Sequence, residues 1–292
     1  MDMIAKNHHE PPLPSLTSVW HNAPYAAISP ERPELSALGK TVIITGAGSG
    51  IGQATALAFA RAGAAKIVLI GRNEEKLQNT QKQLDCISSV HPASVTDEAA
   101  ITEIATATGP WDIMILAAGH ISPKAHLREA SVDEWWQNFE TNVKGTMIAA
   151  NAFLPTANQT HSAIVALSAG VFFPTGLLAG LSGYISSKFT LIKVIEFLAA
   201  ENPNVFAAAL HPGMIETDNF RASGADPSKL PMDSVNLPAE FSVWLTSPEA
   251  AFLNGRFAMA NWDVDELKAK ADQILSRQLL TASVNGWPFS PN

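Results

Sequence analysis

Residues 40–63 constrain the fold more than any other part of the chain, because they run from a strand through a glycine turn into a helix. The strand KTVIIT leads into GAGSGIG, and QATALAFARAG follows with apolar residues at helical spacing. Backbone amides and the positive end of the helix therefore converge on one point. That point suits a pyrophosphate, although a tight structural turn would use the same glycines.

The spacing of these glycines separates the possible phosphate-binding motifs. Gly46, Gly50 and Gly52 fit T-G-x-x-x-G-x-G. The pattern G-x-G-x-x-G fails, because it would need glycine at Ile51 or Gln53. A P-loop also fails, since no Lys followed by Ser or Thr comes after the glycines.

Short apolar runs alternate with longer helical stretches from Gly39 onward. This alternation predicts an α/β fold, with a doubly wound parallel sheet covered by helices on both faces. We expect strands at residues 41–45, 66–70, 111–116, 163–167 and 204–210.

The composition excludes several classes of protein. The 292 residues are 47% hydrophobic and 16% charged, with a net charge of −8. Such a chain buries a large core, unlike a disordered protein, and the lack of a basic run argues against nucleic-acid binding. Cys86 is the single cysteine and the N-terminus lacks the apolar run of a signal peptide, so we expect a cytoplasmic protein.

No formal charge occurs between Lys144 and Lys188, and residues 163–185 are almost wholly apolar. A run of this length could span a bilayer. Pro174 and four interspersed glycines would break a continuous helix, however. We therefore expect a buried strand followed by an apolar loop, and no membrane interaction.

Tyr184 and Lys188 lie four residues apart at the start of a helical stretch, so their side chains share one helix face. A free tyrosine titrates near pH 10, and a neighbouring ammonium lowers that pKa, which suits general acid–base catalysis. Together, TGAGSGIG and this YxxxK spacing resemble the short-chain dehydrogenase/reductase family. The resemblance covers roughly residues 39–260 and implies a Rossmann-like sheet of about seven strands in a single domain.

The resemblance also implies a catalytic set. Tyr184 would protonate or deprotonate the substrate oxygen, while Lys188 would lower the tyrosine's pKa and bind the nicotinamide ribose. Asn142, in FETNVKGT, matches the family's asparagine, which holds a water leading to the lysine.

The serine of this set departs from the family's pattern of two consecutive serines. Ser168 aligns with the first and Ala169 with the second, which normally orients the substrate carbonyl. Either Ser168 rotates into place or another group orients the carbonyl, with Ser182 as a weaker substitute.

Gly71 and Arg72 follow the second strand, where dinucleotide folds place an acid on the ribose 2′-hydroxyl or an Arg beside a 2′-phosphate. Because glycine replaces the acid and Arg72 offers a fork of donors, we expect NADP(H) rather than NAD(H). Alternatively, Arg72 is a solvated turn residue before a helix cap at Asn73. The expected cofactor-binding residues are Gly46, Ser49, Gly50, Ile51, Gly52, Arg72, Val95, Ala118, Gly119, Tyr184, Lys188, Pro212, Gly213, Ile215 and Thr217.

Two positions on the cofactor side also differ from the family. Its NNAG segment reads LAAG at residues 116–119, which puts Ala117 in place of an asparagine, and Ser94 replaces the acid that usually precedes Val95. Against this, HPGMIET at residues 211–217 matches the segment that cradles the nicotinamide carboxamide in the family.

We expect three regions along the chain. Residues 1–38 hold six prolines without a clear period and read as an extended N-terminal arm. Residues 39–262 form the Rossmann-like domain with a substrate loop at 214–237, and residues 263–292 form a C-terminal helix and tail. The arm and tail resemble those of fungal short-chain reductases, some of them associated with secondary metabolism.

Ligands of an open parallel sheet gather at the carboxyl ends of its strands near the switch point, here expected between the first and fourth strands. The uncharged segment VFFPTGLL, residues 171–178, predicts a pocket for a bulky apolar molecule, although core packing or a subunit contact would explain it equally well. The family pairs through helices, which implies a homodimer or homotetramer.

The sequence thus predicts an NADP(H)-dependent oxidoreductase acting on the carbonyl, imine or alcohol of a hydrophobic small molecule, without a metal. The departures at Ala169, Ala117 and Ser94 keep a second hypothesis open. On that hypothesis the chain is a non-redox isomerase or cyclase, or a cofactor-binding regulator.

Overall fold

Seven parallel strands form one sheet in the order β3-β2-β1-β4-β5-β6-β7 in the computed structural model, which describes residue 11 and residues 14–284. The order reverses between β1 and β4, as in a doubly wound sheet. This confirms the predicted α/β fold of about seven strands. The strands are β1 Thr41–Thr45, β2 Lys66–Gly71, β3 Ile87–Pro92, β4 Ile113–Leu116, β5 Ser162–Leu167, β6 Val205–His211 and β7 Arg256–Met259.

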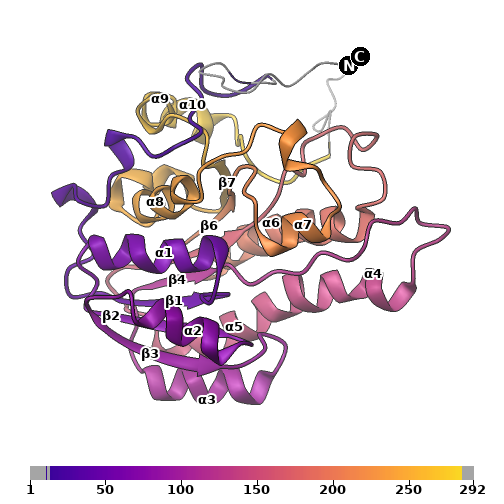
Figure 1. Ribbon diagram of the computed structural model, residues 1–292. Helices are drawn as coiled ribbons and strands as arrows, with labels where there is room; N and C mark the ends of the chain where they lie inside the picture. Colours follow the sequence, from indigo (N-terminus) through magenta and orange to yellow (C-terminus); the bar gives the residue numbers. More distant parts are fainter. Residues whose placement is uncertain (1–10, 12–13, 285–292) are drawn as a thin grey trace.

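Helices cover both faces of the sheet (Figure 1). Helices α1 (Gly50–Arg61), α2 (Glu74–Gln81) and α8 (Asn236–Leu245) lie on one face, and α3 (Glu98–Thr108), α5 (Gly145–Phe153) and α6 (Ser182–Glu201) lie on the other. Helix α4 (Val132–Phe139) continues through a π-helical turn, Glu140–Lys144, into α5. The short helices α7 (Asp218–Ala222), α9 (Val264–Ala269) and α10 (Ala271–Ser276) follow β6 and β7.

The central strands are buried on both sides, as parallel strands between two helical layers must be. In β1, Ile43 pairs with Val68 of β2 on one side and with Met114 of β4 on the other, and all three side chains have no exposed surface. Continuous apolar runs therefore identified β1, β2, β4, β5 and β6 from the sequence to within two residues at each end.

Three elements differ from the sequence expectations, because neither β3 nor β7 had an expected range and the C-terminal helix is divided. Strand β3 lies at the edge of the sheet and reads ISSVHP, so it lacks the apolar run that marks a buried strand. The expected C-terminal helix is two short helices, α9 and α10, which meet at Lys270.

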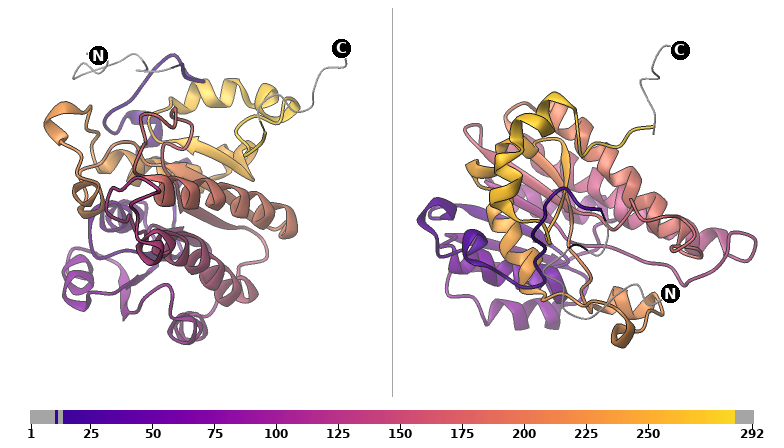
Figure 2. Two further views of the ribbon diagram at one scale, coloured as in Figure 1. Left: turned by 90° about the vertical axis from the view of Figure 1, so that its right-hand side faces the viewer. Right: turned by 90° about the horizontal axis from the view of Figure 1, so that it is seen from above.

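The N-terminal arm packs against the C-terminal region. Ile28 and Leu35 of the arm are buried in the core, and Trp20 pairs with Trp262 in an antiparallel bridge. The Tyr25 hydroxyl donates to the Trp262 carbonyl oxygen, at 3.0 Å. Figure 2 shows the indigo arm running beside the yellow C-terminal helices. The arm is therefore part of the folded body over its described residues.

The long uncharged segment forms a strand and a loop, as expected. Residues 162–167 are β5, and residues 168–181 run as turns to the start of α6. No helix among residues 14–284 is both long enough and apolar enough to cross a bilayer.

Candidate active site

The glycine turn after β1 is too tightly packed for larger side chains. A Cβ at Gly52 would lie 2.3 Å from the carbonyl oxygen of Gly46, and a Cβ at Gly46 would lie 2.8 Å from the amide nitrogen of Ala118. Gly46 and Gly50 also have φ of 69° and 52°, in the left-handed region that glycine adopts readily. Ser49 is the exposed N-cap residue of α1, and Ile51 follows in the first turn. The Ser49 side chain makes no capping hydrogen bond, so it leaves the first amides of α1 uncapped.

The end of β2 carries a free cation beside this turn. Arg72 is exposed and has no hydrogen bond or ion pair within the described part of the chain. Asn73 caps α2, since its Oδ1 accepts a hydrogen bond from the amide of Lys76 at 2.9 Å. The Asn73 cap is therefore confirmed, and it leaves the Arg72 guanidinium available for an anion.

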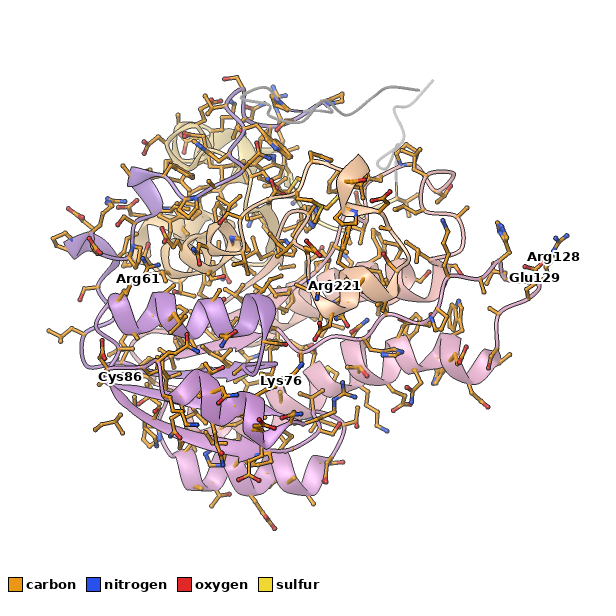
Figure 3. The ribbon with its side chains drawn as sticks, in the orientation of Figure 1. Arg61, Lys76, Cys86, Arg128, Glu129 and Arg221 are labelled. Carbon is orange, nitrogen blue, oxygen red and sulfur yellow. The ribbon has the colours of Figure 1, made fainter. Side chains whose placement is uncertain are left out.

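An ion-pair cluster joins α2 to α7 close by. Lys76 Nζ lies 3.2 Å from Asp218 Oδ2, and Arg221 lies 3.4 Å from the other oxygen of the same carboxylate. Figure 3 labels both cations. A Cβ at Gly50 would lie 3.1 Å from Thr217 Cγ2, so the segment after β6 approaches the glycine turn closely.

Asn142 lies in the π-helical turn between α4 and α5 and is buried. Its Oδ1 accepts from the amide of His120 at 2.9 Å, while its Nδ2 donates to the His120 carbonyl oxygen at 3.0 Å and to Ser187 Oγ at 2.9 Å. Asn142 therefore ties the loop after β4 to helix α6. Single π turns in α-helices often occur at functional sites.

Lys188 is buried on α6, with 4% of its surface exposed. Its Nζ donates to the carbonyl oxygen of Leu167, at the end of β5, at 2.6 Å. A Cβ at Gly119 would lie 3.5 Å from this Nζ and 3.4 Å from Asn142 Oδ1, so glycine makes room for both groups. Burial lowers the pKa of Lys188 to about 8.

Tyr184 lies one helical turn before Lys188, whose Nζ is 5.9 Å from the centroid of the tyrosine ring. Ser187 Oγ, which accepts from Asn142, donates in turn to the Tyr184 carbonyl oxygen at 2.7 Å. Burial raises the pKa of Tyr184 to about 12, so the phenol is neutral at pH 7. The structure thus brings together three of the four expected catalytic residues.

Ser168 has a different environment. It is buried, and its hydroxyl donates to the carbonyl oxygen of Lys188 at 3.1 Å. Ser182, the weaker substitute, accepts a hydrogen bond from Trp135 Nε1 at 3.0 Å. In this conformation the Ser168 proton is directed to the backbone of α6, and it would reach a substrate oxygen only after rotating.

The other expected cofactor residues line the same edge of the sheet. Val95 is buried against Gly145, and Ala118 follows β4, where its amide donates to Thr45 Oγ1 at 3.1 Å. Ile215 is also buried, and it follows Pro212 and Gly213 in the segment after β6. Thr217 caps α7 by accepting from the amide of Phe220.

A cavity of about 910 Å³ opens at the carboxyl ends of β6 and β7. Phe172 and Leu177 from the uncharged loop line it, as do Gly213 and Met214 from the segment after β6. Tyr184 is not among its lining residues. The apolar pocket predicted at the uncharged loop is therefore present, and it lies beside β6 and β7. The substrate position expected between β1 and β4 stays a prediction.

A family model described as short chain dehydrogenase matches residues 40–228. The chain belongs to this family. Among relatives, the short chain dehydrogenase mpl6 of Monascus purpureus is 32% identical, covering 90% of this chain and 95% of the relative. The short chain dehydrogenase/reductase AacuD of Aspergillus aculeatus is 30% identical, covering 88% and 92%. These relatives confirm the resemblance to fungal short-chain dehydrogenases.

Solved structures agree with this assignment. A protein of Beutenbergia cavernae described as an NAD(P)-dependent gluconate 5-dehydrogenase, with NADP bound at low occupancy, has a TM-score of 0.69 and 25% identity. It covers 80% of this chain and 99% of its own. A short-chain dehydrogenase/reductase of Serratia marcescens has the same TM-score at 18% identity, over 76% and 96% of the two chains, and shares the fold.

Several contributors to this short-chain dehydrogenase site were not identified from the sequence. The Leu167 carbonyl oxygen holds Lys188, and Ser187 connects Asn142 to the Tyr184 turn. Ser187 lies within the YxxxK segment, so its position was visible. Its role was not, because a serine one residue from a lysine implies no particular hydrogen bond.

We predict that Gly52→Ala lowers the free energy of unfolding by about 1–3 kcal/mol, because its new methyl group would overlap the Gly46 carbonyl oxygen. Urea unfolding followed by circular dichroism measures the change. Gly176→Ala is the matched control, since nothing lies within 4 Å of its Cβ position. Equal unfolding midpoints for the two variants would contradict this account of the glycine turn.

Proposed function

We propose that this short-chain dehydrogenase is an NADP(H)-dependent oxidoreductase that reduces the carbonyl or imine, or oxidises the alcohol, of a hydrophobic small molecule. The observation that carries this proposal is that Lys188 and Asn142 meet at Gly119, with the Tyr184 ring 5.9 Å from Lys188 Nζ, at the same sheet edge as the glycine turn. In this proposal the Tyr184 phenol donates the proton, the Lys188 ammonium lies beside it, and the glycine turn binds the phosphates of the cofactor.

The glycine turn fits a dinucleotide. Glycines at positions 46 and 52 allow the tight turn that leads into α1, and the amides at the start of α1, which the Ser49 side chain does not cap, suit a pyrophosphate. Arg72 would bind a 2′-phosphate, and Lys188 a ribose. NADP(H), when bound, supplies or accepts the hydride. The NADP in the Beutenbergia relative supports this choice.

Tyr184 is the general acid in the reducing direction. Its neutral phenol donates the Oη proton to the substrate oxygen as the alcohol forms, and the adjacent Lys188 ammonium stabilises the phenolate that remains. In the oxidising direction the same oxygen takes the proton back. Asn142 holds the loop after β4 and helix α6 in register, so that the two side chains keep their separation.

Ser168 has two possible roles in this proposal. As the structure stands, its hydrogen bond to the Lys188 carbonyl oxygen fixes the start of α6 on the end of β5. Rotation about its χ1 would exchange that bond for one to a substrate oxygen. Loss of one donor at a developing oxyanion costs about 3 kcal/mol, so an enzyme without this bond would be slowed rather than inactive.

The fungal relatives support a place in secondary metabolism, and the single unpaired Cys86 supports a cytoplasmic location. Phe197 is 60% exposed on α6, which supports a homodimer or homotetramer formed through this helix.

The second candidate is a non-redox isomerase, cyclase or cofactor-binding regulator on the same fold. It is favoured by the alanine at position 169 and by the hydrogen bond that engages Ser168. NADPH absorbance during incubation with substrate distinguishes the two. A redox enzyme consumes NADPH as product forms, whereas product without NADPH loss would establish the second candidate.

We predict that Tyr184→Phe lowers kcat by about 10²–10⁴-fold, because the ring remains and the transferable proton is lost. The dissociation constant for NADPH should stay within about twofold. Steady-state kinetics and calorimetric titration measure the two quantities. Ser186→Ala, on the exposed side of the same helix, is the control. Unaltered turnover in the phenylalanine variant would refute the proposed acid.

A pH dependence follows from the buried ammonium. Burial lowers the Lys188 pKa to about 8, so the ammonium is present below that pH and is lost above it. We expect kcat/KM for carbonyl reduction to be level near neutral pH and to fall as pH rises through about 8. Lys188→Arg, which retains its charge, should shift the fall to higher pH. An unchanged profile in this variant would remove Lys188 from the pH response.

We predict that Arg72→Ala weakens NADPH binding by about tenfold or more while leaving NADH binding within about twofold, because only NADPH carries a 2′-phosphate. Calorimetric titration of each dinucleotide measures this. Arg128→Ala is the control, since Arg128 is exposed on the loop before α4, far from the glycine turn (Figure 3). Equal losses for both dinucleotides would instead indicate a general effect on the turn.

A further inference from the structure

The cavity beside β6 and β7 is walled partly by the N-terminal arm. Trp20 and Asn22 of the arm line it, together with Phe172 and Phe173 after β5 and Phe257 of β7. The family model matches residues 40–228, so the arm and β7 lie outside it. The arm therefore adds a wall that the matched segment does not itself provide.

Aromatic rings follow one another around the cavity. The Phe172 ring centroid lies 4.6 Å from that of Phe173, 5.9 Å from His211 and 6.0 Å from Phe257. Phe257 in turn meets Trp262 edge-on at 6.4 Å, and the backbone of Trp262 pairs with that of Trp20. Such surfaces favour flat aromatic molecules, because ring edges and faces attract one another beyond simple area burial.

The cavity offers no cation to a charged ligand. Among its described lining residues there is no Lys or Arg, and Asp233 is the one carboxylate. Burial lowers the pKa of His211 to about 4, so its ring is neutral at pH 7. The Asp233 oxygens are already engaged: Oδ1 accepts from Asn22 Nδ2, and Oδ2 from the Met214 amide at 2.7 Å. An anionic substrate would lose hydration without gaining a partner.

Hydrogen bonds fix the arm in place before any ligand arrives. Asn22 bonds to Asp233 through its side chain at 2.5 Å and to the Ser234 amide through its carbonyl oxygen at 2.8 Å. The amide of His21 donates to the Asn261 carbonyl oxygen, and Asn261 Nδ2 returns a bond to His21, each at 2.8 Å. Because these hydrogen bonds already order the arm, little of the free energy of ligand binding is lost in ordering it.

We propose that this cavity binds uncharged, fused-ring aromatic ketones or the corresponding alcohols, and that Trp20 is a specificity-determining residue for them. The inference rests on the proposed oxidoreductase function for the carbonyl, while the ring preference follows from the wall alone. A volume of about 910 Å³ accommodates a molecule of several fused rings. The cavity adjoins Gly213 and Met214, so a ligand in it approaches the expected nicotinamide-binding segment.

The test compares 9-fluorenone with tridecan-2-one, which contains the same number of carbon atoms in a flexible chain, with cyclohexanone as a single-ring reference. Binding is measured by calorimetry on the full chain, with and without NADPH, and NADPH consumption is followed separately. We expect 9-fluorenone to bind about tenfold or more tightly than the other two. Comparable binding of tridecan-2-one would overturn the ring preference.

Variants at Trp20 test the wall. Trp20→Leu should weaken 9-fluorenone binding by about fivefold, whereas Trp20→Phe should restore most of the affinity, because only the latter retains an aromatic ring. Trp136→Ala is the control, since Trp136 is 52% exposed on α4 and does not line the cavity. NADPH affinity and melting temperature, measured for each variant, separate a local loss from unfolding.

The outcomes separate this inference from the proposed function. Binding of 9-fluorenone that depends on Trp20, without NADPH consumption, supports the aromatic site and counts against the oxidoreductase. Reduction of 9-fluorenone that is indifferent to both Trp20 variants, with unchanged affinity, refutes the role of the arm and leaves the oxidoreductase standing.

Discussion

The hydrogen bond from the Lys188 ammonium to the Leu167 carbonyl oxygen is the interaction on which the rest of the site depends. The ammonium of the buried Lys188 must find partners, because an isolated charge in the protein interior is costly. The end of β5 provides one, and it thereby fixes where α6 meets the sheet. Since Tyr184 lies one turn before Lys188, the position of the phenol follows from the anchoring of the lysine.

Polar groups also couple the loop after β4, the π-helical turn and the end of β5 to helix α6. Asn142 holds the His120 backbone from both sides and contacts Ser187, so the loop after β4 is fixed relative to α6. Ser168 adds a second bond between β5 and α6. Because each of these groups is buried, removing one hydrogen-bond partner would leave the other unsatisfied. The cost of that unsatisfied group exceeds the net stabilisation from a single hydrogen bond, so the positions of these side chains are firmly fixed.

Much of the fold and the centre of the site could be predicted from the sequence, because both rest on local pattern. A buried parallel strand such as β5 must be continuously apolar, and the turn at Gly46 and Gly52 tolerates no Cβ. Strand β3 is held by pairing at an edge and carries no such run. The side of the cavity formed by residues 171–178 was predicted from their uncharged sequence. The side formed by the arm was not, because Asn22 and Asp233 meet across 211 positions of sequence and neither belongs to a motif.

Burial shifts the pKa values of Tyr184 and Lys188, the two groups proposed for proton transfer, in opposite directions. It raises the pKa of Tyr184 to about 12 and lowers that of Lys188 to about 8, so each is driven toward its neutral form. A neutral phenol is already the form needed to donate a proton, and reduction needs no prior change in it. Oxidation needs the phenolate, which becomes accessible near neutral pH only with further positive charge beside the ring. Burial is the cause of the Tyr184 pKa shift, so in the proposed oxidation a cation bound at the site would have to favour the phenolate.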